Sequence, residues 1–211
     1  MPDSSPRTAR RADVDSQPLL VVISGPSGVG KDALLDVLKS RGRPYHFAIT
    51  ATTRPNRGAE MDSRDYYFLT PDRFEELAAS GELLENALVY GHRYGVPKAP
   101  VREALAGGRD VLMRTDVQGA ATIKGAVPQA VTIFLAPASL TDLEERLRRR
   151  ATDSQETLRV RLATARREMD AASHFDYVVV NAEGRLEEAA DQVERIIAAE
   201  RTRPERAAPV V

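Results

Sequence analysis

Apolar and polar positions along the chain predict strands and helices in turn from about residue 18 to residue 201. The first apolar run, Leu19 to Ile23, is short and continuous, which is typical of a strand buried on both faces. A glycine-rich stretch follows it, and Leu34, Leu35 and Leu38 then repeat at helical spacing. The ordered part of the chain is therefore expected to begin with a strand, a turn and a helix.

The middle of the chain departs from this alternation. After an expected strand over 45–50, residues 51–64 are polar and poor in helix formers, and short apolar runs follow at 66–69 and 83–90. We expect residues 49–94 to form a small, mixed, sheet-rich insertion.

Beyond the insertion the alternation resumes, with strands expected over 110–113, 130–135 and 177–180. Such alternation predicts a parallel sheet covered by helices on both faces. Substrates of an open sheet of this kind bind at the carboxyl ends of its strands. We therefore expect one α/β domain over 18–201, whose core is formed by 18–48 and 95–201.

The two ends of the chain have few residues to bury, so we expect a disordered tail over 1–17 and a loose tail over 202–211. The formal net charge of −1 argues against broad binding to nucleic acid or to membrane surfaces. The chain has no cysteine and 3 histidines, which excludes thiol chemistry and disfavours a histidine-rich metal site. No apolar run approaches the ~20 residues of a membrane span. No secretory signal is recognisable, and we expect a cytoplasmic protein.

The glycine-rich stretch carries the first chemical signal. It follows the phosphate-loop pattern G-x-x-x-x-G-K-[ST] except at its last position, where Asp32 replaces the hydroxyl residue. Glycines let backbone N–H groups surround phosphate oxygens, the next helix adds its positive dipole end, and Lys31 adds a full charge. The flanking strand and helix favour this interpretation over a plain surface turn. The residues predicted to bind a nucleoside triphosphate are Gly25, Pro26, Ser27, Gly28, Val29, Gly30, Lys31 and Asp32.

A run of arginines is the second signal. Arg146 and Arg150 are four residues apart and share a helix face, and Arg161 follows in a long charged helix. Arginines on a segment that closes over a site neutralise the charge of a transferring phosphoryl group. Taken alone, however, the run fits a solvated basic helix face better.

The insertion and its surroundings carry the third signal. Arg54 and Arg57 lie three residues apart in the polar stretch, near Tyr66, and such side chains hold a phosphate well. Glu85 and Asp116 can accept hydrogen bonds from a base edge that carries N–H donors, as guanine does. Either carboxylate alone is more simply explained as a solvated surface group.

Together these motifs resemble the guanylate kinase family over nearly all of 18–200. The first loop is similar to the family's Gly-Pro-Ser-Gly-x-Gly-Lys, and residues 50–57 to its Ser-x-Thr-Thr-Arg-x-x-Arg. Residues 115–120 resemble its Asp-x-Gln-Gly-Ala, while Glu85 and Tyr94 match its Glu…Tyr-Gly. Several separate motifs in one order make the resemblance specific.

The resemblance implies a P-loop nucleoside monophosphate kinase fold and transfer of the γ-phosphoryl group of ATP to GMP with Mg²⁺, by a monomer or homodimer. It implies that guanine is read by Thr50, Glu85 and Asp116. It implies that the GMP phosphate is held by Arg54, Arg57, Tyr66 and Tyr94. A helical lid, at about 149–167, is expected to complete the catalytic set of Lys31, Arg146, Arg150 and Arg161.

Several positions depart from the family's pattern, among them Gly58, which stands one place early, and Ser63, which replaces a glycine. Asp32 stands where a magnesium-holding hydroxyl is usual, and because a carboxylate is a good oxygen ligand we expect Asp32 to hold the metal. Arg114 stands where the family usually has an acidic residue, and Val96 where a hydroxyl residue is common.

Two alternatives remain open. The Gly-Lys-Asp at the end of the loop also resembles ribose 1,5-bisphosphate phosphokinases, which share the fold but lack the Thr-Thr-Arg-x-x-Arg run. A non-catalytic guanylate-kinase-like scaffold is the other, and such a domain is expected to lose Lys31 and the lid arginines, all of which are present.

Overall fold

The structure is a computed structural model that describes residues 17–89, 91–149, 155–204 and 206–211, without the side chains of 155–158. The predicted N-terminal tail therefore lies outside the described residues, apart from Gln17. Within the described parts of the chain, no helix is long and apolar enough to cross a membrane.

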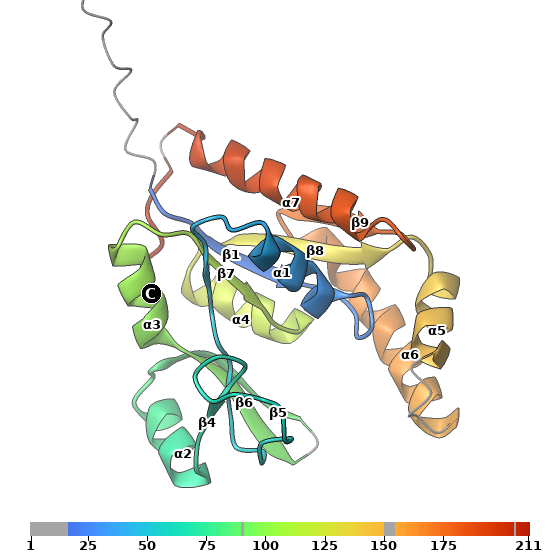
Figure 1. Ribbon diagram of the computed structural model, residues 1–211, viewed down its shortest axis with the longest axis horizontal. Coiled ribbons are helices and arrows are strands. Elements are labelled where there is room, and N and C mark those ends of the chain that lie inside the picture. Colours follow the sequence, from blue (N-terminus) through green and yellow to red (C-terminus); the bar gives the residue numbers. More distant parts are fainter. Residues whose placement is uncertain (1–16, 90, 150–154, 205) are drawn as a thin grey trace, which may run out of the picture.

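A five-stranded parallel sheet forms the centre of the molecule (Figure 1), as the alternation of strands and helices predicts. Its strand order is β2-β7-β1-β8-β9. Its central strands β1, β7 and β8 are short apolar runs that are buried on both faces, which is the usual composition of a parallel sheet, whereas the edge strand β9 exposes Val178 and Val180. Their bounds are β1 Leu20–Ser24, β2 His46–Phe47, β7 Val111–Arg114, β8 Val131–Pro137 and β9 Tyr177–Asn181.

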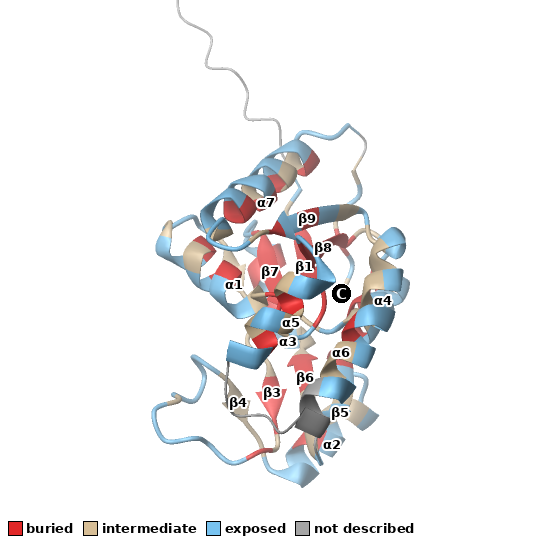
Figure 2. Cartoon of the chain, turned by 90° about the vertical axis from the view of Figure 1, so that its right-hand side faces the viewer, coloured by how far each residue is buried: buried red, intermediate tan, exposed pale blue. Residues whose placement is uncertain are grey.

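Helices cover both faces of this sheet, because successive residues of a strand point to opposite sides. Val21 and Ile23 of β1 belong to a core shared with α1 (Lys31–Ser40), α5 (Leu140–Arg149) and α7 (Leu186–Arg201). Leu20 and Val22 face the other way, into a core shared with α3 (Lys98–Ala106) and α4 (Val117–Ala126). Figure 2 shows these central strands as the main buried layer.

A second, smaller sheet lies within the predicted insertion and forms the lower lobe in Figure 1, with strand order β4-β3-β6-β5. It is mixed, since β3 pairs in parallel with β4 and antiparallel with β6. Its strand β6 runs to Pro97, three residues past the expected end of the insertion at 94. The elements are β3 Ala51–Thr52, β4 Tyr67–Phe68, α2 Pro71–Ala79, β5 Leu83–Val89 and β6 His92–Pro97.

Helix α6 (Gln155–Asp170) lies beside α5 at the right of Figure 1, and the short 3₁₀ helix η1 (Ala171–His174) connects it to β9. Ala165 of α6 is fully buried in the core that includes α1 and α7. The C-terminal half of α6 is therefore fixed to the domain next to the glycine-rich loop.

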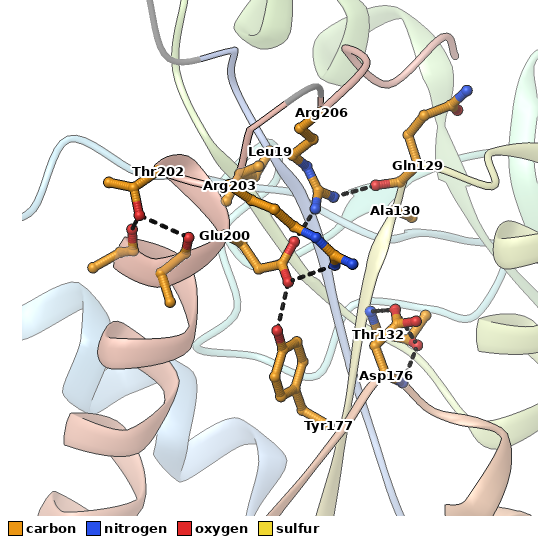
Figure 3. A network of polar contacts seen from close by, with 12 residues as sticks. Leu19, Gln129, Ala130, Thr132, Asp176, Tyr177, Glu200, Thr202, Arg203 and Arg206 are labelled. Carbon is orange, nitrogen blue, oxygen red and sulfur yellow. Dashed lines mark hydrogen bonds and ion pairs between the residues drawn. The ribbon is translucent and has the colours of Figure 1, made fainter. Parts of the chain in front are cut away.

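The C-terminal segment differs from the loose tail expected for 202–211. The side chain of Glu200 is buried and accepts a hydrogen bond from the Tyr177 hydroxyl at 2.5 Å. The same carboxylate forms ion pairs with the guanidinium groups of Arg203 and Arg206 (Figure 3). Arg102 donates to the carbonyl of Val211 at 2.8 Å. Charged side chains thus anchor this segment, and an apolar pattern alone does not reveal such an anchor.

Candidate active site

The glycine-rich loop joins the end of β1 to the start of α1, at the carboxyl edge of the main sheet. Gly25 has φ +142°, and a Cβ at this position would clash with the carbonyl oxygen of Leu135 on the neighbouring strand β8. Only glycine fits such a backbone and such an approach. Gly30 is the N-cap of α1, so the first N–H groups of a ten-residue helix face the space inside the loop.

Lys31 is the first residue of α1 and folds back over the loop. Its Nζ donates to the carbonyls of Gly25 at 2.5 Å and Pro26 at 3.1 Å. Burial lowers the pKa of Lys31 below its ordinary value, and the carboxylate of Glu168 acts in the opposite direction. A buried ammonium that is held by two neutral carbonyls is well placed to bind an anion.

Glu168 on α6 is a residue that the sequence patterns did not single out. Its Oε2 accepts a hydrogen bond from the Ser27 backbone N–H at 3.3 Å. Burial raises the pKa of Glu168, while Lys31 lowers it. One of the N–H donors of the loop is therefore hydrogen-bonded to a protein carboxylate.

Arg146 lies behind the loop and contacts its backbone. It donates to the carbonyls of Val29 at 3.2 Å and Asn181 at 2.8 Å, and pairs with Glu183 at 3.0 Å. Asn181 in turn donates to Val29 at 2.8 Å. A cavity of about 330 Å³ beside these residues is lined by the loop, α5 and the segment after β9.

The other two predicted lid arginines are less defined. Arg150 lies outside the described residues. Arg161 lies on α6, on the same helix as Glu168. The structure therefore brings Arg146 to the loop and places the α6 arginine on the helix that contacts it.

In the insertion, Arg54 is held in place over an aromatic ring. Its guanidinium group is bonded to both carboxylate oxygens of Glu60, at 2.7 and 2.5 Å, and lies 4.7 Å from the centre of the Tyr66 ring. Arg57 contributes its backbone N–H to Glu60 at 2.9 Å, and its side chain is exposed. Arg54 and Tyr66 are thus brought together as predicted, whereas the Arg57 side chain is not in contact with them in any described interaction.

Glu85 is the most buried carboxylate among the predicted residues, with 8% of its surface exposed. Burial, and then the charge of Asp116, raise the pKa of Glu85 to about 7. Asp116 caps α4 by accepting from the Gly119 N–H at 2.7 Å. Glu85 Oε2 lies 3.1 Å from the position of a Cβ at Gly119, so the absence of a side chain there leaves room for the carboxylate.

The remaining predicted residues of the acceptor half lie around this group. Tyr94 on β6 is opposite Thr52 of β3, and its ring meets that of Tyr66 edge-on at 6.4 Å between centres. Thr50 lines a cavity of about 490 Å³ between α1 and the insertion, together with Tyr66, Asp32 and Arg114. The two halves of the predicted site therefore border on one another.

Asp32 connects the phosphate loop with the insertion through Arg114, which the loop motif does not indicate. Its Oδ1 is ion-paired with Nε of Arg114, and Arg114 Nη2 lies 3.4 Å from the hydroxyl of Tyr66. Among the described residues, no group of three or more His, Asp or Glu side chains could hold a metal ion. Mg²⁺ that is bound to substrate phosphates needs only one or two protein carboxylates. Asp32 as a metal ligand therefore stays a prediction, and in the structure its carboxylate is paired with Arg114.

The fold, together with a phosphate loop and an adjoining group of predicted acceptor residues, defines a P-loop nucleoside monophosphate kinase of the α/β class. The family model described as guanylate kinase matches residues 17–200. Guanylate kinase 2, chloroplastic/mitochondrial, of Oryza sativa subsp. japonica is 48% identical over 188 residues, which cover 89% of this chain and 66% of the rice protein. The guanylate kinase of Carboxydothermus hydrogenoformans is 42% identical over 188 residues, covering 89% of this chain and 91% of that protein. The chain belongs to the guanylate kinase family.

The solved structures agree with this assignment. The crystal structure of guanylate kinase from Anaplasma phagocytophilum matches with a TM-score of 0.70 and 33% sequence identity. The match covers 92% of this chain and 91% of that one. The agreement extends over both the main sheet and the insertion.

Proposed function

We propose that this protein is an ATP-dependent guanylate kinase that transfers the γ-phosphoryl group of ATP to GMP, giving ADP and GDP in purine nucleotide metabolism. Membership of the family supports the reaction, and the residues of the two half-sites support their individual roles. The observation that carries the choice of acceptor is Glu85, a buried carboxylate next to Asp116.

On the donor side, the loop Gly25 to Gly30 and Lys31 hold the phosphates of ATP. The N–H groups of the loop and the start of α1 are donors, and Lys31 exchanges two carbonyl partners for phosphate oxygens. We assign the cavity beside Arg146 and Asn181 to the nucleoside of ATP, because it borders the same loop.

On the acceptor side, we assign the reading of guanine to Glu85, Asp116 and Thr50. The guanine edge carries two adjacent N–H donors, which match ionised carboxylates and mismatch adenine. A site of buried acceptors disfavours a base that leaves them unpaired. We assign the phosphate of GMP to Arg54, Arg57, Tyr66 and Tyr94.

Phosphoryl transfer needs alignment and charge neutralisation rather than a protein nucleophile. An ionised acceptor phosphate attacks the γ-phosphorus of ATP, the bond to the β-phosphate oxygen breaks, and ADP leaves. We assign the stabilisation of the shared charge to Lys31 and to the arginines of the lid, Arg150 and Arg161. We assign Arg146 to the same catalytic set, and it also donates to the Val29 carbonyl of the loop. Closure of the lid, about 149–167, over the insertion excludes water.

Magnesium belongs to this proposal as a companion of the ATP phosphates. Mg²⁺ keeps several waters and binds through substrate phosphates in such sites, which requires few protein ligands. We also propose a cytoplasmic protein that acts as a monomer or homodimer.

The test is a coupled assay of ADP release with GMP, AMP, CMP and UMP, with and without Mg²⁺, and with ribose 1,5-bisphosphate as a fifth acceptor. We expect turnover with GMP that depends on Mg²⁺, and little with the other acceptors. Activity on ribose 1,5-bisphosphate alone would overturn the proposal. A Lys31→Met variant that keeps every measurable function would favour a non-catalytic scaffold instead.

A further inference from the structure

Arg114 is the last residue of β7 and lies at the carboxyl edge of the main sheet. It is in register with Ile23 of the neighbouring strand β1, directly before the phosphate loop. Residues at this edge face the substrate sites of parallel α/β sheets. Arg114 therefore lies at the edge of the sheet where substrates of such folds bind.

The guanidinium group of Arg114 connects the two halves of the site. Nε is paired with Asp32 at the start of α1, and Nη2 lies 3.4 Å from the Tyr66 hydroxyl in the insertion. Among the described contacts none uses Nη1, and a guanidinium group has five N–H donors in a planar fork. The fork therefore still has donors to offer on the side of the cavity lined by Tyr66 and Thr50.

Stability does not account for this arrangement. The Asp32 side chain is 73% exposed, and an ion pair with so exposed a partner contributes little to folding. The pair also brings a second cation close to Lys31: after burial, the charge of Arg114 lowers the pKa of Lys31, while the charge of Asp32 raises it. Two neighbouring cations at the junction of donor and acceptor sites are favourable when an anion lies between them.

We propose that Arg114 binds the phosphate of the acceptor nucleotide together with Tyr66, and that Asp32 is a positioning residue that holds the Arg114 guanidinium in place. This inference rests on the proposed function of the same site. Arg114 then reduces the repulsion between the acceptor phosphate and the triphosphate of the donor. Asp32 acts on the acceptor side through Arg114, although it belongs to the donor loop.

The test compares the binding of GMP and of guanosine, which lacks the phosphate, to the complete protein by titration calorimetry. In Arg114→Met we expect GMP to bind about tenfold or more weakly, because a charge-assisted contact to phosphate is lost. The affinity of this variant for guanosine should be within about twofold of the wild-type affinity, since the hydrogen bonds to the base do not involve Arg114. The matched control, Arg109→Met, removes the same charge from an exposed position before the other end of β7, and should change neither.

Three outcomes would overturn the assignment: unchanged GMP binding in Arg114→Met, an equal loss for GMP and guanosine, or full binding by Arg114→Lys. The lysine variant keeps one charge without the planar fork, and we expect it to lose part of the affinity and to remain folded. For Asp32→Asn we expect a smaller loss, and no further loss when it is combined with Arg114→Met. Additive losses would exclude a positioning role for Asp32. Wild-type protein that binds GMP without phosphorylating it would contradict the proposed function and leave this binding comparison intact.

Discussion

The carboxylate of Glu168 accepts a hydrogen bond from the Ser27 N–H at 3.3 Å, so a side chain of α6 occupies a donor of the phosphate loop. Burial raises the pKa of Glu168, and the charge of Lys31 lowers it. A phosphate that uses the same N–H must displace this carboxylate or lie against it.

We therefore expect Glu168→Gln to lower the KM for ATP. The change should be about threefold, because a partly exposed charge contact is worth at most about 1 kcal/mol. Steady-state kinetics with varied ATP at saturating GMP would measure it. Asp170→Asn removes the same charge from an exposed position on the same helix and should leave the KM for ATP unchanged. A higher KM in Glu168→Gln would mean that the carboxylate supports the loop instead.

The pKa of Glu85 predicts a pH dependence of acceptor binding. Burial and Asp116 raise this pKa to about 7, and guanine N–H donors require the ionised carboxylate. Below pH 7 the protein must lose a proton to bind GMP, so its KM should rise by up to about tenfold per pH unit. Above pH 8 the KM should be constant.

The measurement is a pH profile of the KM for GMP between pH 5.5 and about 8.5, compared with that of Glu85→Gln. The comparison is needed because a phosphate monoester itself titrates near about pH 6. Equal slopes in the wild type and the variant would contradict a role of Glu85 ionisation in binding GMP.

The same pKa makes Glu85 a destabilising group in the ligand-free protein. Its folded pKa is about 7 and its ordinary value is 4.5, so the folded state binds more protons between these pH values and stability falls as pH rises through them. The loss is on the order of 1 to 3 kcal/mol at pH 8. Glu85→Gln should therefore melt several degrees above the wild type at pH 8, with a difference that vanishes near pH 4.5. Calorimetric scans at both pH values would detect the effect, and a lower melting temperature at pH 8 would refute it.

The close packing around Gly119 predicts that a side chain at this position disturbs the acceptor pocket. A Cβ there would clash with Thr115 Oγ1 and lie 3.1 Å from Glu85 Oε2, so Gly119→Ala must displace at least one of them. We expect the KM for GMP to rise about tenfold and stability to fall by about 1 to 3 kcal/mol, with the KM for ATP unchanged. Gly125→Ala on the same helix meets nothing within 4 Å and should be neutral or slightly stabilising. Similar kinetic constants for Gly119→Ala and Gly125→Ala would show that the pocket adjusts to the added methyl group, which would contradict this prediction.

The anchored C-terminal segment predicts a stability effect without a catalytic one. Arg206 pairs with the buried Glu200, and its side chain is 14% exposed. Arg206→Ala should lower the free energy of unfolding by about 2 kcal/mol, since it leaves a buried carboxylate with fewer partners. Arg203→Ala, at 67% exposure, should cost under about 0.5 kcal/mol. Urea unfolding measures both, and a change in kcat in either variant would contradict a purely structural role.

Much of the fold follows from local patterns in the sequence. The central strands β1 and β8 are continuous apolar runs because both their faces are buried, and β1 is the run before Gly25. The phosphate loop is recognisable because its geometry needs particular residues at fixed spacing. Residues that depend on such local constraints could be predicted.

Other features depend on contacts between distant segments, which no local pattern encodes. Glu168 is one acid in a charged helix, and only the packing of α6 brings it to Ser27. The loop motif alone predicts a role for Asp32 at the phosphates, whereas its pairing with Arg114 depends on a strand about eighty residues away. Arg206 lies in a segment that is rich in proline and charge, which gives no sign of its buried partner.

The chain enters the insertion through β3 and leaves it through β6, and these strands are neighbours, with Thr52 opposite Tyr94. The chain therefore crosses between the main sheet and the lobe twice, at neighbouring strands. Leu84 of β5 and Val96 of β6 are buried in the core shared with α3 and α4, so the base of the lobe is also packed against the main sheet. The contact between Arg114 and Tyr66 adds a polar link between the lobe and the main sheet, so a substitution of Arg114 changes the attachment of the lobe as well as the charge of the site.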